Sequence, residues 1–570
     1  MIGDVRTPRS HLVLLVGMTI LAIVLGWIGL DYCLPHAANN DEIVYYSQYR
    51  AFVEGDEEPE KRRRFVAYPA IWTRPSVYLP RSEMPAPSMD LATEVVRANH
   101  DHIFLRRCVV VLGSLSIAAA WLLARRFVGS GWALVTAGFV GTSVLAFCLV
   151  TQSRPHSVAL PAIVLAVAAS VEVVRRGTMS ASLLAGLASG AAIAALQNGA
   201  AVLLPLAAAH ALRLRSDWKR AIIGLTAASV VVAACFFYAY PAALAKVLAK
   251  PFAGSTRHGF LASHGVVLED FQGGGFGVVL RTFAYHDPLL LLGAAATLVA
   301  GIVVLVRRRT VLPNLRDELL VVLAFCVPYV IALGLFERTF FRFALPLVPF
   351  AALFTAIGLR ALGRAGVVLA AGILVVQTAC IVQIVRLHVA GDTAEQAAAW
   401  IDENLDRHTA RIAISPWVDL PLVRTSEALA AHGIGSQDEF AHWLDHQRAM
   451  DPAQRDAMGW AIVDMPLRRA VQRNALAADP AAFIRALDAD YVLVDVFAGR
   501  ERPIMAHVRE GARATGRLIA RFTPQGPDEE GPQQLDPYAS LEMFGQDRFV
   551  FLIFGARALG TGLELYRIER

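Results

Sequence analysis

The chain has 570 residues, of which 56% are apolar and only 18% are charged. Soluble domains usually carry about 25% charged residues, so this composition excludes a soluble protein over the whole length. The net charge of +5 is modest, and the arginines flank apolar segments without forming the basic stripe expected of a nucleic-acid-binding protein. The six cysteines are scattered, and their spacing fits neither a disulfide framework nor a zinc site.

Eleven apolar segments predict transmembrane helices. The first, at about 12–30, is longer than the roughly 7–15-residue core of a cleaved signal peptide, which predicts an uncleaved anchor helix. Most of the segments are long enough to cross a hydrocarbon core about 30 Å thick. The pair on either side of Gln197 and Asn198 is short enough to form one bent element. The ten later segments lie near 105–124, 132–151, 157–174, 181–196, 199–212, 221–240, 288–306, 318–336, 343–359 and 366–386.

The arginines between these segments predict the orientation of the chain. With the N-terminus in the cytoplasm, every short loop on the cytoplasmic side is basic, as the positive-inside rule requires. Two long loops, about 31–103 and 241–287, then lie outside, and an odd number of spans places the C-terminus outside as well. The protein is therefore predicted to be a multi-pass protein of the inner or plasma membrane. The residues that support this orientation are Arg125, Arg126, Arg175, Arg176, Arg213, Arg215, Lys219, Arg220, Arg307, Arg308, Arg309, Arg316, Arg360 and Arg364.

From Gly391 onward the composition is that of a soluble domain. Thr393 and Gln396 predict a capping box at the start of a helix, whose apolar face is formed by Ala397, Trp400, Ile401 and Leu405. Strand-like runs follow at 411–415, 491–496, 549–554 and 563–568, and a loop-like stretch runs from Thr523 to Pro537. The predicted organisation is a transmembrane module at 1–390 and an extracytoplasmic α/β domain at 391–570.

The first long loop holds an acidic pair close to the membrane. Asp41 and Glu42 follow the first helix, and Tyr45, Tyr46, Tyr49 and Phe52 then recur at helical spacing. This spacing predicts a short helix at the interface, where amphipathic rings settle. Two interpretations of the pair remain open: contact with a lipid headgroup, or a solvated acidic cap of the helix.

One helix followed by an Asp-Glu pair and a tyrosine resembles the start of the GT-C superfamily of membrane glycosyltransferases. The branch concerned includes the protein O-mannosyltransferases and the lipid A aminoarabinose transferase. No later motif is specific alone, but together they follow that branch in order over most of residues 1–415. They are 108–127, Gln152-Ser153-Arg154-Pro155-His156, 186–205, the run from Arg342 to Pro349, and 400–414.

The sequence also departs from the pattern of that branch. His156 stands where an aspartate is usual, and Gln197-Asn198 where a Thr-Lys pair is common. Phe343 replaces a tyrosine, and Tyr68-Pro69-Ala70 lacks the His-Pro-Pro character of the O-mannosyltransferases. These departures leave the class of acceptor open, and they leave open a catalytically inactive scaffold.

The resemblance implies transfer of a sugar from a polyprenyl phosphate to an acceptor hydroxyl outside the membrane. A phosphate leaves without a strong acid, so one carboxylate is enough to deprotonate the acceptor. Direct displacement inverts the anomeric carbon and needs no second carboxylate as nucleophile. By resemblance the base is Asp41, with Glu42 orienting it. The expected partners are the donor lipid, membrane lipids and an acceptor that is a glycan, a lipid or a protein.

Arginines suit a phosphate because they form bidentate charge-assisted hydrogen bonds. Arg154 is the leading candidate, since it lies between two apolar segments beside a proline, although snorkelling to headgroups also explains such a position. The other candidates on the predicted outer side are Arg74, Arg257, Arg338 and Arg342, and further candidate site residues are His156, Tyr45, Gln197 and Asn198.

No cofactor is predicted. The loop from 256 to 287 holds His258, His264, Glu269, Asp270, His286 and Asp287, but their spacing matches no metal-ligand pattern. Gly273-Gly274-Gly275 lacks the lysine of a P-loop and is either a flap over the site or a plain loop. The rival function is a transporter or flippase of lipid-linked glycans. Transporters usually carry charges near the midplane and repeat symmetry, and neither is evident in this sequence.

Overall fold

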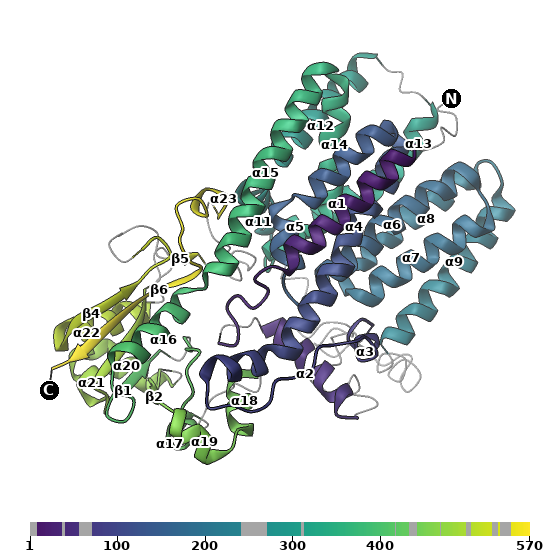
Figure 1. Ribbon diagram of the computed structural model, residues 1–570. Helices are drawn as coiled ribbons and strands as arrows, with labels where there is room; N and C mark the ends of the chain where they lie inside the picture. The colour runs from purple at the N-terminus through teal and green to yellow at the C-terminus, as the bar shows by residue number, and fades with distance from the viewer. Residues whose placement is uncertain are drawn as a thin grey trace.

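The computed structural model describes residues 8–36, 40–55, 71–240, 271–308, 313–415, 418–432, 442–467, 469–496, 503–526, 534–535 and 549–569. A bundle of long helices forms the larger part of the molecule, and a smaller unit built around a β-sheet lies at one end of it (Figure 1). The N-terminal helix belongs to the bundle, whereas the C-terminus lies in the sheet unit.

Seven helices in the described part of the chain are long and apolar enough to cross a membrane. Two further apolar helices, α7 and α12, are shorter than this criterion requires over their described residues. The protein is therefore a polytopic helical membrane protein, as predicted. The bundle comprises α1 (Arg9–Trp27), α4 (Leu91–Gly141), α5 (Val144–Val150), α6 (Pro155–Arg176), α7 (Met179–Ala195), α8 (Leu203–Leu214), α9 (Trp218–Ala239), α12 (Pro288–Arg308), α13 (Pro313–Leu335), α14 (Val348–Ala361) and α15 (Arg364–Ala390).

The predicted segment 105–124 and the first half of the segment 132–151 lie within α4, which reverses direction inside its bounds, and the second half of the latter contains α5. Gly129 has φ 77°, a left-handed conformation that glycine adopts readily. The Trp121 Nε1 donates a hydrogen bond to the Ser130 carbonyl oxygen at 3.3 Å, and Gly141 lies against Ile117. The two parts of α4 therefore pack against each other. Each predicted apolar segment is largely helical, but the count of eleven spans stays a prediction, because α8 has only 12 residues.

The break at Gln197 and Asn198 separates two helices. Leu196 is extended, with φ −155°, and a short 3₁₀ helix, η2 (Gln197–Val202), connects α7 to α8. Gly199 approaches the Ala192 carbonyl so closely that a side chain would collide with it. The alternative of one bent element is therefore wrong.

Three short helices lie outside the long spans. The predicted helix after the acidic pair is confirmed as α2 (Asn40–Val53), and α3 (Thr73–Ser76) follows it. Gly273-Gly274-Gly275 was predicted to be a flap or a plain loop, and neither holds at Gly275, where α11 (Gly275–His286) begins. A side chain at Gly275 would collide with the backbone of α13, so this glycine permits close packing. Residues 241–270 lie outside the described residues.

The sheet unit has a mixed sheet with strand order β2-β1-β3-β6-β4, and β5 pairs with β6. The first three strands are parallel, and β6 is antiparallel to its neighbours. Alternate residues of β3 bury opposite faces: Leu493 packs in one cluster with Ile401 of α16, whereas Val492 packs in another with Val508 of α22. The strands are β1 (Arg411–Ile414), β2 (Ala461–Asp464), β3 (Tyr491–Val496), β4 (Gly516–Phe522), β5 (Gln534–Leu535) and β6 (Gly560–Ile568).

Helices cover this sheet and connect it to the bundle. They are α16 (Thr393–Asn404), α17 (Ser426–His432), α18 (His442–Ala449), α19 (Pro452–Met458), α20 (Ala470–Ala478), α21 (Pro480–Ala486) and α22 (Pro503–Thr515). The apolar face predicted for α16 is confirmed, since Ala397 and Ile401 are fully buried. The predicted capping box is shifted by one residue, because Asp392 is the cap and Glu395 its partner.

One predicted strand is wrong. Residues 549–554 contain the short helix α23 (Phe549–Leu552), and Phe549, Val550 and Ile553 pack into the hydrophobic core of the bundle. The Gln383 side chain of α15 donates to the Ile553 carbonyl oxygen at 2.8 Å. A continuous apolar run fits a buried strand as well as a buried helix, and contact with the bundle selects the helix. β2 and β4 were not predicted.

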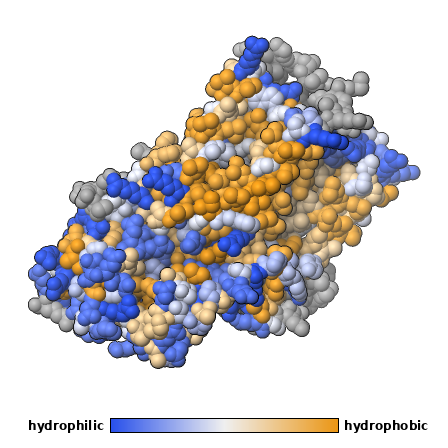
Figure 2. Space-filling model, viewed as in Figure 1, coloured by the Kyte–Doolittle hydropathy of each residue, from blue (hydrophilic) through white to orange (hydrophobic). Residues whose placement is uncertain are grey.

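Apolar side chains cover the visible face of the bundle, whereas the sheet unit is mostly hydrophilic (Figure 2). Val368 and Val375 on α15 are 73% and 68% exposed, as expected of residues that face lipid. The placement of the sheet unit outside the cell and its boundary at residue 391 stay predictions.

Asp287 is a buried carboxylate that joins several helices. It accepts hydrogen bonds from Ser143 Oγ at 2.7 Å, from the Val144 backbone N–H at 3.0 Å and from Gln377 Nε2 at 3.2 Å. Asp287 lies between α11 and α12, so these bonds attach it to the start of α5 and to α15. The carboxylate is satisfied by structural contacts.

Asp287→Ala should destabilise the bundle, because it leaves these donors buried without an acceptor. A buried hydrogen-bond donor that has lost its acceptor costs about 1–3 kcal/mol of stability. We expect a lower melting temperature for the detergent-solubilised variant, whereas Asp217→Ala, which removes the exposed cap of α9, should have a smaller effect. Equal melting temperatures for the two variants would contradict the structural role of Asp287.

Candidate functional site

Glu42 lies at the centre of a buried polar cluster between α2, α4 and the start of α6. Its carboxylate receives two hydrogen bonds from Arg106, from Nε at 3.0 Å and from Nη2 at 2.9 Å. It also accepts the Ser153 backbone N–H at 2.6 Å. Glu42 and Arg106 are both fully buried. The Glu42 carboxylate therefore attaches the short helix α2 to the long helices.

This environment keeps Glu42 ionised. Burial alone would raise the pKa of Glu42, but the Arg106 guanidinium, the His102 ring and the Ser153 N–H outweigh burial and lower it to about 2. A carboxylate with such a pKa is a poor proton acceptor near neutral pH. The interpretation of Glu42 as a solvated helix cap is wrong, and its contacts suit an orienting role.

Arg106 was not among the predicted site residues. Its Nη1 donates to the Leu30 carbonyl oxygen at 2.6 Å and to the Tyr32 carbonyl oxygen at 3.1 Å. The guanidinium also lies over the Tyr32 ring, 4.6 Å from its centroid. The signal was present in the sequence, since Arg106 opens an apolar segment much as Arg154 does. Only the fold shows that its partner is Glu42, 64 residues earlier.

A second polar group surrounds Ser153, the residue whose backbone N–H is bonded to Glu42. The side chains of Gln152, Ser153, His156 and Ser157 are buried. Within the described part of the chain, polar atoms of these four side chains have no hydrogen-bond partner. Buried polar groups are normally paired, and an unpaired one costs about 1–3 kcal/mol. These atoms are therefore placed to bond a ligand.

Two arginines accompany this polar group. Arg154 is fully buried at the N-cap of α6, and Arg342 is 9% exposed in the 3₁₀ helix η4 (Phe341–Leu347), which packs against α6. Both guanidinium groups act electrostatically on the His156 ring. Aromatic rings complete the surroundings: Phe343 is stacked on His156 with centroids 5.7 Å apart, and Arg342 lies 4.0 Å from the Phe340 centroid. This arrangement suits an anionic ligand.

The other predicted site residues have different surroundings or are not described. Arg74 is exposed over the Phe52 ring, and Arg338 is exposed after α13. Tyr45 is buried against Trp72, with ring centroids 4.9 Å apart. Gln197 is half-buried and Asn198 is exposed in η2.

The predicted base is only partly described. The backbone of Asp41 lies in α2, but its side chain is outside the described residues, as is the whole of Arg257. The catalytic role of Asp41 therefore stays a prediction.

The prediction about the metal signal stays open for the residues that the structure describes. Among them, no group of three potential ligands is close enough to hold a metal ion. Asp287 bonds to Ser143 and Gln377. His286 Nδ1 bonds the Thr282 carbonyl oxygen, and the four remaining candidates in the second long loop, His258, His264, Glu269 and Asp270, lie outside the described residues. Metal dependence stays untested.

Residues 85–242, which include α4, Arg106 and the start of α6, match the model of the dolichyl-phosphate-mannose-protein mannosyltransferase family. The predicted resemblance to GT-C membrane glycosyltransferases is confirmed over this segment. The match supports a membrane glycosyltransferase. No curated protein sequence is significantly similar to this chain.

Several solved structures are similar to the chain. ArnT from Cupriavidus metallidurans bound to undecaprenyl phosphate is 14% identical, with 89% of this chain and 96% of that chain covered and a TM-score of 0.42. The apo form of the same protein is 13% identical, with 89% of this chain and 95% of that chain covered and a TM-score of 0.43. The Archaeoglobus fulgidus oligosaccharyltransferase in complex with Zn and sulfate is 13% identical, with 89% and 72% covered and a TM-score of 0.39. At TM-scores below 0.5, these matches establish no further property of this chain.

Arg106→Met should destabilise the protein by about 3–5 kcal/mol, because it leaves the Glu42 charge buried without its partner. The double variant Glu42→Leu/Arg106→Met should recover part of this loss, since no unpaired charge remains. Thermal unfolding in detergent measures both. A double variant no more stable than Arg106→Met would show that the pair is not the source of the loss.

The same pair sets a pH dependence of stability. Because the pKa of Glu42 is lowered to about 2, its contribution should be complete above the unfolded value of about 4.3. That contribution should disappear as the pH falls from there toward 2. The wild type should therefore lose more stability over this range than Glu42→Gln, measured as melting temperature against pH. Parallel curves would contradict the lowered pKa.

Proposed function

We propose that the protein transfers a sugar from a polyprenyl phosphate to an acceptor hydroxyl on the outer side of the membrane, with inversion at the anomeric carbon. The observation that carries this proposal is the buried pair of arginines, Arg154 and Arg342, beside buried polar groups at the start of α6 that have no hydrogen-bond partner among the described residues. The description of the matching family names dolichyl-phosphate mannose, which is a sugar on a polyprenyl-type phosphate.

The two arginines would hold the donor phosphate. A guanidinium at the centre of a membrane helix costs about 2.5–3.5 kcal/mol, so a bound anion would stabilise two buried guanidinium groups that both act on the His156 ring. A phosphate suits this role, because its oxygens match the paired N–H groups of arginine. The same contacts stabilise the phosphate as it leaves with the negative charge that develops in the transition state.

The acceptor proton would be taken by Asp41. Glu42 is committed to Arg106 and to the Ser153 N–H, so it fixes α2 against α6 and is a positioning residue. Asp41 precedes it by one residue in α2, so its backbone lies next to the residue that bonds Arg106. His156, where the family usually has an aspartate, is stacked on Phe343 and contributes shape and hydrogen-bonding groups to the site.

Arg154→Ala should reduce donor use, since a hydrogen bond to a charged group contributes about 1.5–3 kcal/mol, or roughly a 10- to 150-fold change in affinity. Arg154→Lys should restore only part of this, because lysine lacks the two-pronged guanidinium. The measurement is the KM for a labelled polyprenyl-phosphate sugar in membrane fractions. Arg220→Ala, at an exposed position on α9, is the control. Wild-type KM in both Arg154 variants would assign Arg154 to lipid headgroups.

Asp41→Asn should lower the transfer rate by about 10²–10⁴ while folding and donor binding persist, because the amide cannot accept the proton. Asp217→Asn is the matched exposed control. Undiminished transfer would remove Asp41 from the mechanism. Absence of transferase activity in the parent would instead favour the transporter or the inactive scaffold, which a flipping assay with the same labelled lipid separates.

A further inference from the structure

A cavity of about 800 Å³ lies between the bundle and the sheet unit, away from the buried arginine pair. Its walls come from α2, from the first turns of α4 and from α18 of the sheet unit, and they include Tyr46, Arg50, Asp101, His442 and Asp445. The cavity is therefore completed only where the C-terminal part of the chain meets the first loop. Its volume is sufficient for a ligand of two or three sugar rings.

The charges of this cavity are largely balanced by ion pairs. Arg50 binds Asp101 at 3.1 Å and Glu54 at 2.9 Å, and Arg97 binds Glu94 at 2.7 Å. Because these arginines are already neutralised by carboxylates, a phosphate or carboxylate ligand would meet as much negative as positive charge. A ligand without net charge avoids this repulsion.

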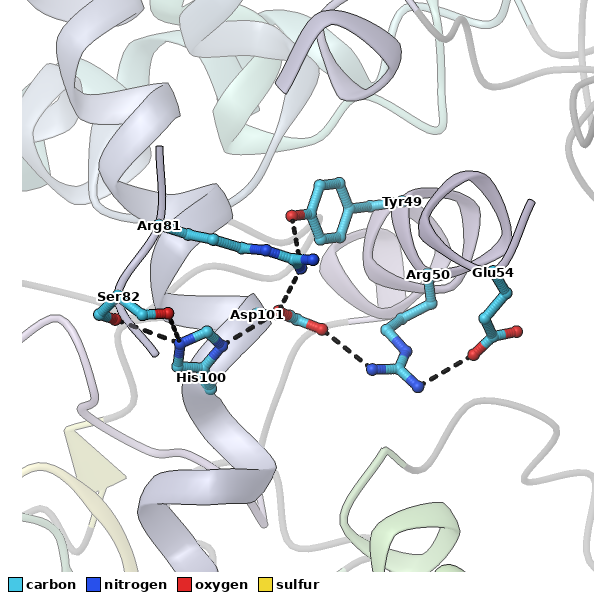
Figure 3. A network of polar contacts seen from close by, with 7 residues as sticks. All are labelled: Tyr49, Arg50, Glu54, Arg81, Ser82, His100 and Asp101. Carbon is cyan, nitrogen blue, oxygen red and sulfur yellow. Dashed lines mark hydrogen bonds and ion pairs between the residues drawn. The ribbon is translucent and has the colours of Figure 1, made fainter. Parts of the chain in front are cut away.

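The paired groups retain hydrogen-bonding capacity for hydroxyls. Figure 3 shows Asp101 with Arg50 at its Oδ2 and with Arg81 and His100 both at its Oδ1. A carboxylate has about four lone-pair sites, and a guanidinium has five N–H donors. A wall of such alternating donors and acceptors matches a polyhydroxyl compound, in which each hydroxyl both donates and accepts.

His442 supplies the observation that points to a ligand. Its side chain is 3% exposed and lines the cavity, and within the described part of the chain its Nε2 has no hydrogen-bond partner. Burial and the nearby His102 and Arg106 hold the pKa of His442 well below its ordinary value, so the ring is neutral. A neutral imidazole nitrogen pairs well with a hydroxyl.

An aromatic surface accompanies these polar groups. The rings of Tyr46 and His442 lie with centroids 5.5 Å apart, and His102 is within 5.3 Å of Tyr46 and 4.9 Å of His442. A flat ring offers an apolar face to the C–H groups of a sugar, while the polar side chains bond its hydroxyls. His102 also lies 3.9 Å from Glu42, so it connects the ring cluster beside the cavity to the buried junction of α2 and α6.

We propose that this cavity binds the acceptor and that the acceptor is an uncharged carbohydrate. The inference rests on the proposed transferase function and specifies its acceptor class. The sheet unit would then select the acceptor through α18, while Arg154 at the start of α6 and Arg342 in η4 hold the donor.

Saturation-transfer NMR on the full-length protein in detergent tests this directly. The probes are glucose, mannose, galactose, N-acetylglucosamine, maltose and cellobiose, with a serine- and threonine-containing peptide in a parallel sample. At least one saccharide should show transfer, and His442→Phe, which keeps the ring but removes Nε2, should weaken its binding at least fivefold. Asp445→Ala should also weaken binding. Asp402→Ala should not, because Asp402 is an exposed residue of α16 that is paired with Arg407.

The outcomes separate this inference from the proposed function, because binding is measured without donor or transfer. Absence of signal from every saccharide overturns the inference, as does signal from the peptide alone. Saccharide signal that is unchanged in both cavity variants also overturns it, provided that their melting temperatures match the wild type. Absence of transferase activity in a protein that still binds saccharide would instead count against the proposed function.

Discussion

The buried ion pair between Glu42 and Arg106 is the interaction on which the candidate site depends. Two charges without water are costly to bury, and they remain buried only when every lone pair and N–H is satisfied. Here the carboxylate also accepts the Ser153 N–H, and the guanidinium also donates to the carbonyls of Leu30 and Tyr32. Four chain segments are thereby held at one point, and Arg154 follows directly after the segment held through Ser153.

A second buried pair connects the bundle to the sheet unit. His36 Nε2 lies 2.8 Å from Asp392 Oδ2, and the two side chains are 2% and 3% exposed. Burial lowers the pKa of His36, but the Asp392 carboxylate outweighs burial and raises it. Asp392 also caps α16, so one carboxylate links the loop after α1 to the first helix of the sheet unit.

These two pairs explain why a site lies between the units. The start of α4 contacts α18 through a hydrogen bond of 2.9 Å between His446 and Glu94, and the cavity opens beside this contact. Glu42 of α2 accepts the N–H of Ser153, which precedes Arg154, and lies 3.9 Å from His102. Under the two proposals, donor and acceptor would therefore both bind near this short helix.

Much of the fold follows from local pattern. Apolar runs of 17–27 residues have no alternative to helices inside a membrane, because each backbone group must bond within its own segment. The positions of α6, α9 and α15 were therefore predicted closely, as was α2 from the spacing of its tyrosines. Arg154 stood out because a charge beside an apolar run is costly wherever the chain places it.

The sequence by itself determined the membrane helices, the family resemblance and the leading arginine. Only the tertiary structure decided that residues 549–554 contain a helix, that the Glu42 carboxylate is paired with Arg106, and that the His442 ring packs beside Tyr46 and His102. Each of these depends on contacts between residues far apart in the chain, 64 positions for Glu42 and Arg106. Local periodicity carries no information about such partners, because they are selected by the packing of whole helices and by the need to satisfy every buried charge.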